Sequence, residues 1–456
     1  MKCRPLFAGL APGIGGAALF ALGLALFATA NPVRAAAPAP LNPGAINLVF
    51  VPSAEANPAT GALTPRGLNR ALRLGPWLAH LSGAAADGIF ALAPATHRIG
   101  SGGDIPDMAP LATIEPYALL YDAPIAASTA PVSAAACAKP PCQGIDYADK
   151  DGANEALVER ILKARLPGMF VFAAPPETLN LMMRRTAADE GWKLAIAPFQ
   201  ADDHERIAAL SLAPGAATAT LREYLADVAP PSAYPDFGLR GGGACLEAPS
   251  AISSAARGLR PPAGANRGET VYLIRHAEAH PTPLFENGNL VCQGEWRAIG
   301  AGPALVKKIG RVPDFVYASD PSQPMQARSG GARFSYVRPA LTLAPFATEY
   351  GAPLRLASGF NWWDAEAADK FFFFGGAASR FSGKTVLVAW EHRTIGRIVG
   401  ALLHDYGLDP AELPRWNRND YDTIWKVRLD ERGDLTFGVD CEGIPSGSLP
   451  PACPLD

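Results

Sequence analysis

Apolar runs and amphipathic stretches alternate along the chain from about residue 45 onward. In the second half, continuous apolar runs of buried-strand type lie at 271–274, 315–318 and 386–390. Stretches with apolar residues at helical spacing follow these runs, at 295–309, 339–350 and 394–406. Alternating strands and helices predict an α/β fold, a three-layer α/β/α sandwich with a mainly parallel sheet.

The features of the second half also occur, in the same order, in the first half. Ala54–Ala56 matches Ala277–Ala279, both reading Ala-Glu-Ala after an apolar run. Further matches are 63–71 with 290–298, 86–94 with 313–321, 109–125 with 338–354, 169–179 with 385–395 and 203–212 with 420–429. Ordered self-similarity of this kind predicts a tandem duplication.

We therefore predict two tandem sandwich domains that contact each other. The first spans 45–228 and the second 268–456. The segment between them, 229–267, is rich in proline and glycine and is predicted to be a linker.

Composition and charge exclude some classes of partner. The chain is 49% hydrophobic and 18% charged, its net charge is −3, and it has no run of Lys and Arg, so we expect no nucleic acid partner. Residues 1–37 are predicted to be a signal peptide, because Lys2 and Arg4 precede a long apolar run; an uncleaved anchor is the alternative. No later segment approaches a membrane span, so no other membrane contact is expected.

Cysteine usage agrees with export to the periplasm or the medium. After Cys3, an even number of cysteines remains, which favours disulfides in an exported protein. Closeness in the sequence alone suggests the pairs Cys137–Cys142 and Cys441–Cys453.

A strand that ends on a cation and an imidazole is the main chemical feature. The run 271–274 leads directly into Arg275 and His276. An imidazole nitrogen is a good nucleophile near neutral pH, and a guanidinium beside it can hold phosphoryl oxygens. Arg338 and His392, which follows another strand, could complete such a pocket.

Three segments resemble the histidine phosphatase superfamily, also called phosphoglycerate-mutase-like. They are "LIRHAEA", an Arg-Pro-Ala-Leu-Thr segment that begins at Arg338, and "VLVAWEHRTIG". The resemblance covers about 268–440. It implies an α/β sandwich, a phosphohistidine on His276, phosphate contacts from Arg275, Arg338 and His392, and no metal or other cofactor.

The sequence departs from the family pattern at several points. Ala277 replaces the usual glycine, and an insertion before Arg338 contains Arg328 and Arg333, either of which could be mistaken for the second arginine. For the acid that protonates the leaving group, Glu391 is the first choice, and Asp364 and Glu349 are alternatives. His276, Glu278 and His280 alternate and could instead be metal ligands.

The first copy lacks the polar groups of such a pocket. Pro52, Ser53, Ala109 and Pro176 stand where the second copy has Arg275, His276, Arg338 and His392. We expect an exported hydrolase of a small phosphate ester beside an inactive copy. The alternatives are a catalytically silent protein that binds phosphate or a phosphorylated ligand, and a scaffold that acts through the inactive copy.

Overall fold

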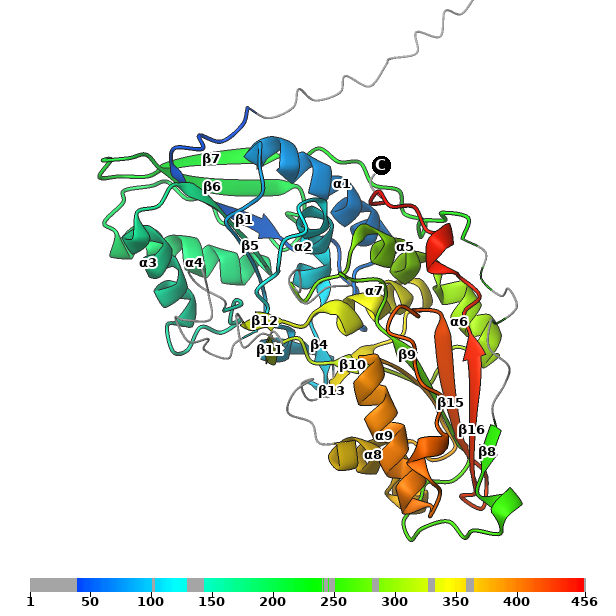
Figure 1. Ribbon diagram of the computed structural model, residues 1–456. Helices are drawn as coiled ribbons and strands as arrows, with labels where there is room; N and C mark the ends of the chain where they lie inside the picture. The colour runs from blue at the N-terminus through cyan, green and yellow to red at the C-terminus, as the bar shows by residue number, and fades with distance from the viewer. Residues whose placement is uncertain are drawn as a thin grey trace, which may run out of the picture. The chain divides into compact units, whose positions relative to one another are not determined.

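Two mixed β-sheets, of five and seven strands, organise the fold (Figure 1). The computed structural model describes residues 39–454 apart from 101–102, 129–142, 240, 242–244, 246–250, 281–286, 327–332 and 358–364. The predicted signal peptide lies outside the described residues. Ala37–Asp456 form one compact unit. Within the described part of the chain, no helix has the length and apolar character needed to cross a membrane.

The N-terminal half contains the five-stranded sheet, with strand order β2-β5-β1-β6-β7. The three strands β2, β5 and β1 are parallel, whereas β6 and β7 are antiparallel to their neighbours. Its strands are β1 Ile46–Pro52, β2 Gly88–Ala91, β5 Gly168–Ala174, β6 Arg206–Leu212 and β7 Thr220–Leu225, and β3 Arg98–Ile99 pairs with β4 Ile105–Pro106 outside it. Its helices are α1 Pro65–Ser82, α2 Ala109–Leu120, α3 Ala153–Ala164 and α4 Pro176–Asp189.

The C-terminal half contains the seven-stranded sheet, with strand order β13-β10-β14-β9-β15-β16-β8. Its strands are β8 Ala251–Ser253, β9 Glu269–Arg275, β10 Phe315–Ser319, β13 Leu354–Ala357, β14 Thr385–Trp390, β15 Thr423–Leu429 and β16 Leu435–Cys441; β11 Pro324–Gln326 and β12 Arg333–Ser335 form a separate hairpin. Its helices are α5 Cys292–Gly300, α6 Gly302–Ile309, α7 Arg338–Tyr350, α8 Ala365–Phe373 and α9 His392–Asp405. Strand β8 lies in segment 229–267, which is predicted to be a linker.

The sheets are mixed rather than mainly parallel. In the C-terminal half, β13, β10, β14 and β9 are parallel, whereas β15, β16 and β8 are antiparallel to their neighbours. The parallel strands are joined by helical crossovers, and a short turn joins β15 to β16, which makes that pair a hairpin. The periodicity predicts the α/β alternation but not the antiparallel strands β8, β15 and β16.

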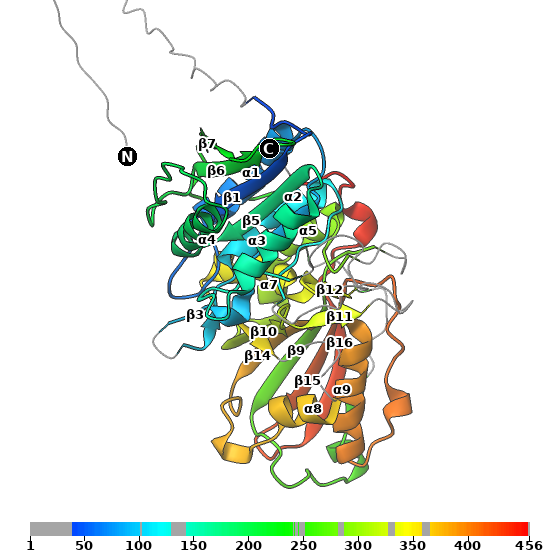
Figure 2. The ribbon, with the colours of Figure 1, turned by 90° about the vertical axis from the view of Figure 1, so that its left-hand side faces the viewer.

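Helices cover both faces of each sheet. Successive side chains of a strand point to opposite faces, so an apolar strand presents apolar side chains to the helices on both sides. In β1, Val49 and Val51 pack with α1 and α2, whereas Leu48 and Phe50 pack with α3 and α4 (Figure 1). Helices α8 and α9 cover the corresponding outer face of the C-terminal sheet (Figure 2). Each half is therefore a three-layer sandwich.

One hydrophobic cluster continues from the N-terminal half into the C-terminal half. It includes Leu78 of α1 and Ile114 of α2 together with Ala298 of α5 and Phe346 of α7, all nearly fully buried. Helix α1 also contacts α7 directly. The two halves therefore share an inner core of helices, and neither inner face is left to solvent.

The two halves repeat both their topology and a specific contact. The order β2-β5-β1-β6-β7 corresponds to β10-β14-β9-β15-β16, with the same strand directions. Thr113 Oγ1 in α2 accepts a hydrogen bond from the Ala54 N–H at 2.9 Å, and Thr342 Oγ1 in α7 accepts one from the Ala277 N–H at 2.8 Å. The first turn of each helix is thus bonded to the segment that follows the central strand.

A buried ion pair is repeated as well. Glu55 pairs with Arg70 at 2.7 Å, and Glu278 pairs with Arg297 at 2.8 Å. Neither arginine is more than 3% exposed in its side chain. The repeated Ala-Glu-Ala of the sequence therefore carries the same structural contact in both halves.

Glu115 of α2 and Glu295 of α5 form a buried carboxyl pair within the shared core. Burial, with the charge of Glu295 and a hydrogen bond to it, raises the pKa of Glu115 well above its usual range. Burial raises the pKa of Glu295 to about 7, although its hydrogen bond with Glu115 acts in the opposite direction. The pair therefore retains a proton at neutral pH.

Replacing Glu295 with glutamine should flatten part of the pH dependence of stability. Because the folded pKa is raised, the wild-type protein binds the proton more tightly than the unfolded chain does, so stability is lost as pH rises from the ordinary glutamate range through about 7. Between pH 5 and 8, the Glu295 carboxyl should lower the free energy of unfolding of the wild-type protein by on the order of 2 to 3 kcal/mol. Glu295→Gln should not show this decrease in urea unfolding. Exposed Glu159→Gln is the control; wild-type and Glu295→Gln profiles that run parallel would contradict the assignment.

Candidate active site

The ends of two neighbouring parallel strands bring three of the predicted site residues together. β9 and β14 pair so that Arg275 lies opposite Trp390, and the His276 N–H donates to the Trp390 carbonyl at 2.9 Å. His392 begins α9 shortly after the end of β14. Because the carboxyl ends of parallel strands meet at one edge of a sheet, Arg275, His276 and His392 share that edge.

The first turn of α7 adds Arg338 to this edge. Thr342 Oγ1 donates to the Arg338 carbonyl at 2.8 Å while accepting from the Ala277 N–H, so the turn is bonded to the residue after His276. The positive charges of Arg275, Arg338 and His392 all act on the His276 imidazole. The predicted nucleophile His276 and the three predicted phosphate-contacting residues are therefore brought together.

The two alternative arginines are placed differently. Arg333 is a residue of β12, where it pairs with Gln326 of β11. Arg328 lies outside the described residues. Among the described candidates, only Arg338 lies at the start of α7, the helix whose Thr342 is hydrogen-bonded to Ala277, the residue after His276.

Backbone carbonyls and an aromatic face hold the two guanidinium groups. Arg275 is 7% exposed, its guanidinium lies 3.9 Å from the Tyr421 ring centre, and its Nη1 donates to the carbonyls of Arg418 and Asp420. Arg338 is 5% exposed, and its Nε donates to the Asn289 carbonyl at 2.7 Å.

One buried nitrogen of each guanidinium lacks an acceptor among the described residues. Within the described part of the chain, Nε of Arg275 and Nη2 of Arg338 are buried and donate to no acceptor. A buried donor without an acceptor is unfavourable by about 1–3 kcal/mol, more for a charged group. Both atoms are therefore suited to oxygens of an anion.

The environment of His276 favours a neutral imidazole. Burial lowers its pKa well below the ordinary value, and the charges of Arg275, Arg338 and His392 lower it further. Nδ1 lies 2.7 Å from the Ala277 carbonyl oxygen, which can only accept, so Nδ1 carries the hydrogen. The other ring nitrogen, Nε2, then has the free lone pair that a nucleophile needs.

Glu391, the first choice for a general acid, caps helix α9 instead. Its Oε2 accepts hydrogen bonds from the N–H groups of Arg393 and Thr394, at 2.8 and 3.0 Å, and its Oε1 lies 2.9 Å from His392 Nδ1. Burial alone would raise its pKa, but the hydrogen bond and charge of His392 and the two backbone donors together bring the pKa below its usual value. An ionised carboxylate that accepts two backbone hydrogen bonds is poorly suited to giving up a proton.

The other two acid candidates are not found beside His276. Glu349 lies near the opposite end of α7 from Arg338, about 16 Å away by the rise of a helix. Burial raises its pKa, and Tyr350 and Asp236 are the groups that act on it. Asp364 lies outside the described residues.

The alternative metal site at His276, Glu278 and His280 is not assembled. Both carboxylate oxygens of Glu278 accept hydrogen bonds from Arg297, and His280 is paired with Asp122. Among the described residues, the one group with metal-ligand geometry contains Cys245 and Cys441, whose sulfurs are joined in a disulfide.

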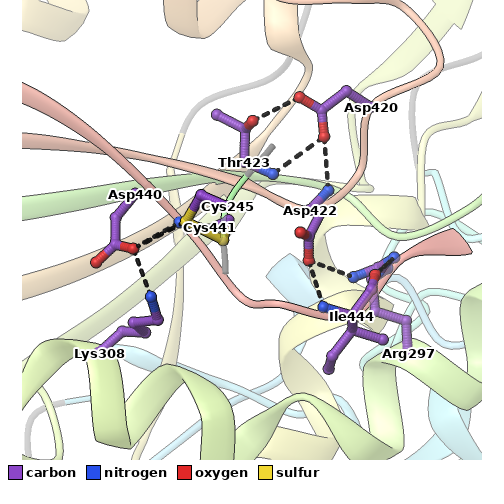
Figure 3. The surroundings of a disulfide bond; sticks show 9 residues. All are labelled: Cys245, Arg297, Lys308, Asp420, Asp422, Thr423, Asp440, Cys441 and Ile444. Atoms are coloured by element: carbon purple, nitrogen blue, oxygen red, sulfur yellow. Dashed lines mark hydrogen bonds and ion pairs between the residues drawn. A yellow bond between two sulfur atoms is a disulfide. The ribbon is translucent and has the colours of Figure 1, made fainter. Parts of the chain in front are cut away.

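The segment that supports Arg275 is braced by a disulfide (Figure 3). Asp420 accepts hydrogen bonds from the backbone of Asp422 and Thr423 at 2.9 and 3.1 Å, which fixes the turn before β15. Thr423 lies opposite Cys441 in the β15–β16 pairing, and Cys441 is bonded to Cys245. The disulfide therefore ties down the strand next to the carbonyls that hold Arg275.

The disulfides differ from the pairing suggested by closeness in the sequence. Cys245 is bonded to Cys441 and Cys292 to Cys453, so the predicted Cys441–Cys453 pair is wrong. Cys292 begins α5, where the C-terminal segment passes it. Folding brings distant cysteines together, and separation along the chain does not report this. The other predicted pair, Cys137–Cys142, lies outside the described residues.

The N-terminal half repeats the backbone of the site without its polar groups. The Ser53 N–H donates to the Ala174 carbonyl at 3.2 Å, as His276 does to Trp390, and Ala109 and Pro176 begin α2 and α4. Pro52, Ser53, Ala109 and Pro176 supply neither a cation nor an imidazole at these positions. His204, which the sequence alignment places over Tyr421, bonds through Nδ1 to the Ser53 carbonyl.

Tyr336 and Tyr421 also belong to the site, and neither is predicted from the sequence. Their ring centres lie 5.9 and 6.0 Å from that of His276. Tyr421 also carries the guanidinium of Arg275, and Tyr336 lies 5.7 Å from that of Arg338. Tyr336 stands two residues before Arg338, and that nearness was the one signal available in the sequence.

The chain matches no family model and no curated protein. Similar solved structures include a phosphoglycerate mutase from Plasmodium falciparum, with 15% identity, 39% of this chain and 92% of that chain covered, and a TM-score of 0.25. A mycobacterial glucosyl-3-phosphoglycerate phosphatase has 13% identity, coverages of 38% and 98%, and a TM-score of 0.24. A phosphoserine phosphatase from Entamoeba histolytica has 15% identity, coverages of 37% and 94%, and a TM-score of 0.20. TM-scores this low assign no family.

Replacing Glu391 with alanine should destabilise the protein through the loss of the α9 cap. Two backbone N–H groups would lose their acceptor, and the free energy of unfolding should fall by about 1 kcal/mol in urea denaturation. Glu391→Asp keeps a carboxylate that caps helices well and should recover most of the loss. Equal stability of Glu391→Ala and wild type would show that the cap contributes nothing.

Proposed function

We propose that the protein is a histidine-type phosphatase that hydrolyses a phosphate monoester through a phosphohistidine on His276. The observation that carries the proposal is a buried, neutral imidazole beside two buried guanidinium groups, each with an unpartnered N–H within the described structure. This combination suits a nucleophile and a phosphoryl-binding site, and the sequence motifs support the same family. The proposed reaction needs no metal or other cofactor.

In the proposed mechanism, Arg275, Arg338 and His392 hold the oxygens of the phosphoryl group. They counter the negative charge carried by those oxygens in the transition state. Nε2 of His276 attacks phosphorus, the P–O bond of the ester breaks, and the leaving oxygen takes a proton. Water then attacks phosphorus, the P–N bond breaks, and inorganic phosphate and neutral His276 are regenerated.

The proton donor to the leaving group is not Glu391 in this proposal. The carboxylate of Glu391 is ionised and engaged with the start of α9, so we assign it the orientation of His392. Glu349 is excluded by its position at the far end of α7. Asp364 stays a candidate.

We further propose that the two halves arose by tandem duplication and that the N-terminal copy is inactive. The repeated strand order, the Thr113 and Thr342 contacts and the repeated Glu–Arg pair support this proposal. The boundaries 45–228, 229–267 and 268–456 stay predictions.

We propose export to the periplasm or the medium. Two disulfides join cysteines that are far apart in the sequence, and structural disulfides are typical of oxidising compartments. The predicted signal peptide agrees with this location. The proposed partner is a small phosphate ester; no nucleic acid is expected.

A protein that binds phosphate or a phosphorylated ligand without turnover is the second candidate. The position of Glu391 favours it, because no carboxyl suited to protonating a leaving group is found beside His276 in the described part of the chain. Such a protein would be stabilised thermally by phosphate or vanadate and would not hydrolyse esters.

Release of p-nitrophenol from its phosphate ester tests the proposal. Wild-type protein should turn over in the presence of chelator between pH 4 and 8, and His276→Ala should lose at least 100-fold of kcat, because the nucleophile is gone. His80→Ala, an exposed histidine of α1, is the matched control and should retain activity. Activity of His276→Ala within about tenfold of wild type would exclude this nucleophile.

The pH profile of the same assay should lack an acid limb at the ordinary histidine pKa. The pKa of His276 is lowered, so the neutral nucleophile persists below pH 6.5, and kcat/KM at pH 5.5 should stay within about twofold of its value at pH 6.5. A tenfold fall per pH unit that begins at pH 6.5 would contradict a buried, neutral His276.

A further inference from the structure

The turn after α2 in the N-terminal half contacts a loop of the C-terminal half. Asn287 Nδ2 donates to the carbonyl and to Oδ1 of Asp122, at 2.9 and 3.1 Å. His280 Nε2 forms an ion pair with the same Oδ1. Asp122 therefore joins two points of the segment that follows His276, although it belongs to the other half.

The contacted loop is hydrogen-bonded directly to Arg338. Asn287 Oδ1 accepts from the Asn289 N–H at 2.9 Å, and the Asn289 carbonyl accepts from Arg338 Nε at 2.7 Å. The Gly288 carbonyl accepts from the N–H of Arg338 at 3.2 Å. Asn289 is fully buried. Both the backbone and the side chain of Arg338 are thus bonded to the loop that Asp122 holds.

A second, buried contact reaches the segment just before Arg338. The Ala127 N–H donates to Ser335 Oγ at 2.8 Å, and Ser128 Oγ donates to the Ser322 carbonyl at 2.6 Å. Ser128, Ser322 and Ser335 are at most 4% exposed. Ser335 precedes Tyr336, whose ring lies beside both His276 and Arg338.

We propose that the N-terminal half positions Arg338 for phosphate binding and that Asp122 is the positioning residue. This inference rests on the proposed function, because it assigns a task to Arg338. Asp122 touches no substrate and acts through Asn287, Asn289 and Arg338. The copy that lacks a nucleophile then contributes to the active site by holding one of its cations.

The backbone at Asp122 determines the cleanest substitution. Asp122 has φ of 52°, in the left-handed region that glycine adopts without strain. Asp122→Gly therefore removes the carboxylate without adding strain to the folded backbone. Asp122→Asn keeps an acceptor for Asn287 and tolerates the same φ.

The chain offers a matched control. Asp227 is also an exposed aspartate of the N-terminal half with positive φ, and among the described residues its side chain forms no hydrogen bond or ion pair. Asp227→Gly thus repeats the substitution without the contact to the C-terminal half.

The experiment measures orthovanadate affinity, kcat/KM for p-nitrophenyl phosphate and Tm in the full chain. Asp122→Gly should weaken vanadate binding and lower kcat/KM about three- to tenfold, because a guanidinium that is no longer fixed binds the anion less well. Asp122→Asn should retain most of both values, and Asp227→Gly should match wild type. Equal Tm values for the two glycine variants would separate positioning from stability.

A double-mutant cycle tests whether Asp122 acts through Arg338. In an Arg338→Ala background, Asp122→Gly should cause no further loss of vanadate affinity. Asn287→Asp keeps the acceptor for Asn289 but faces Asp122 with a like charge, so it should weaken vanadate binding in the same way. This variant provides a second test should Asp122→Gly fold poorly.

The outcomes separate the two proposals. The positioning role would be overturned if Asp122→Gly and Asn287→Asp bound vanadate with wild-type affinity. It would also be overturned if Asp122→Gly weakened vanadate binding as much in the Arg338→Ala background as in wild type. Either result would leave the proposed function standing. Wild-type protein that neither hydrolyses the ester nor binds vanadate would overturn the proposed function, and the positioning role with it.

Discussion

Mutual repulsion of buried positive charges is the constraint on which the site depends. Arg275 and Arg338 lie at one strand edge with His276, and each guanidinium acts on the imidazole. Like charges in a low-dielectric interior destabilise one another unless dipoles or counter-charges compensate. Here backbone carbonyls and aromatic faces supply much of the compensation. Dipoles leave the site positive, which keeps it able to bind an anion, whereas a carboxylate bonded to each arginine would neutralise it.

The carbonyls that compensate these charges come from segments that other parts of the fold must hold. The turn that carries Arg418 and Asp420 leads into β15 beside the Cys245–Cys441 disulfide, and the loop of Asn289 lies against the N-terminal half. Preorganised dipoles stabilise a transition state only when their positions are fixed before the reaction. The disulfide and the contact between the halves are therefore supports for the electrostatics, in addition to their contribution to stability.

The sequence predicts the residues that strand ends and helix starts place, and it misses those that depend on tertiary contacts. Arg275, His276 and His392 follow apolar runs, and parallel pairing brings such ends together. The capping role of Glu391 could not be predicted, because it depends on the geometry at the start of α9 and on the nearness of His392, which together lower its pKa. The Cys245–Cys441 bond and the mixed sheets arise from long-range pairing that local pattern does not encode.

The N-terminal half, for which we propose no catalytic role, stabilises the C-terminal half through the shared core. Helices α5 and α7 of the C-terminal half bury apolar residues such as Phe346 against α1 and α2. Without the N-terminal half this face would be exposed to water, at a loss of roughly 25 cal/mol for each Å² of apolar surface. α7 also carries Arg338 at its first residue. Packing that stabilises α7 therefore also fixes a cation of the candidate site, so the N-terminal half supports the position of Arg338 in the C-terminal half.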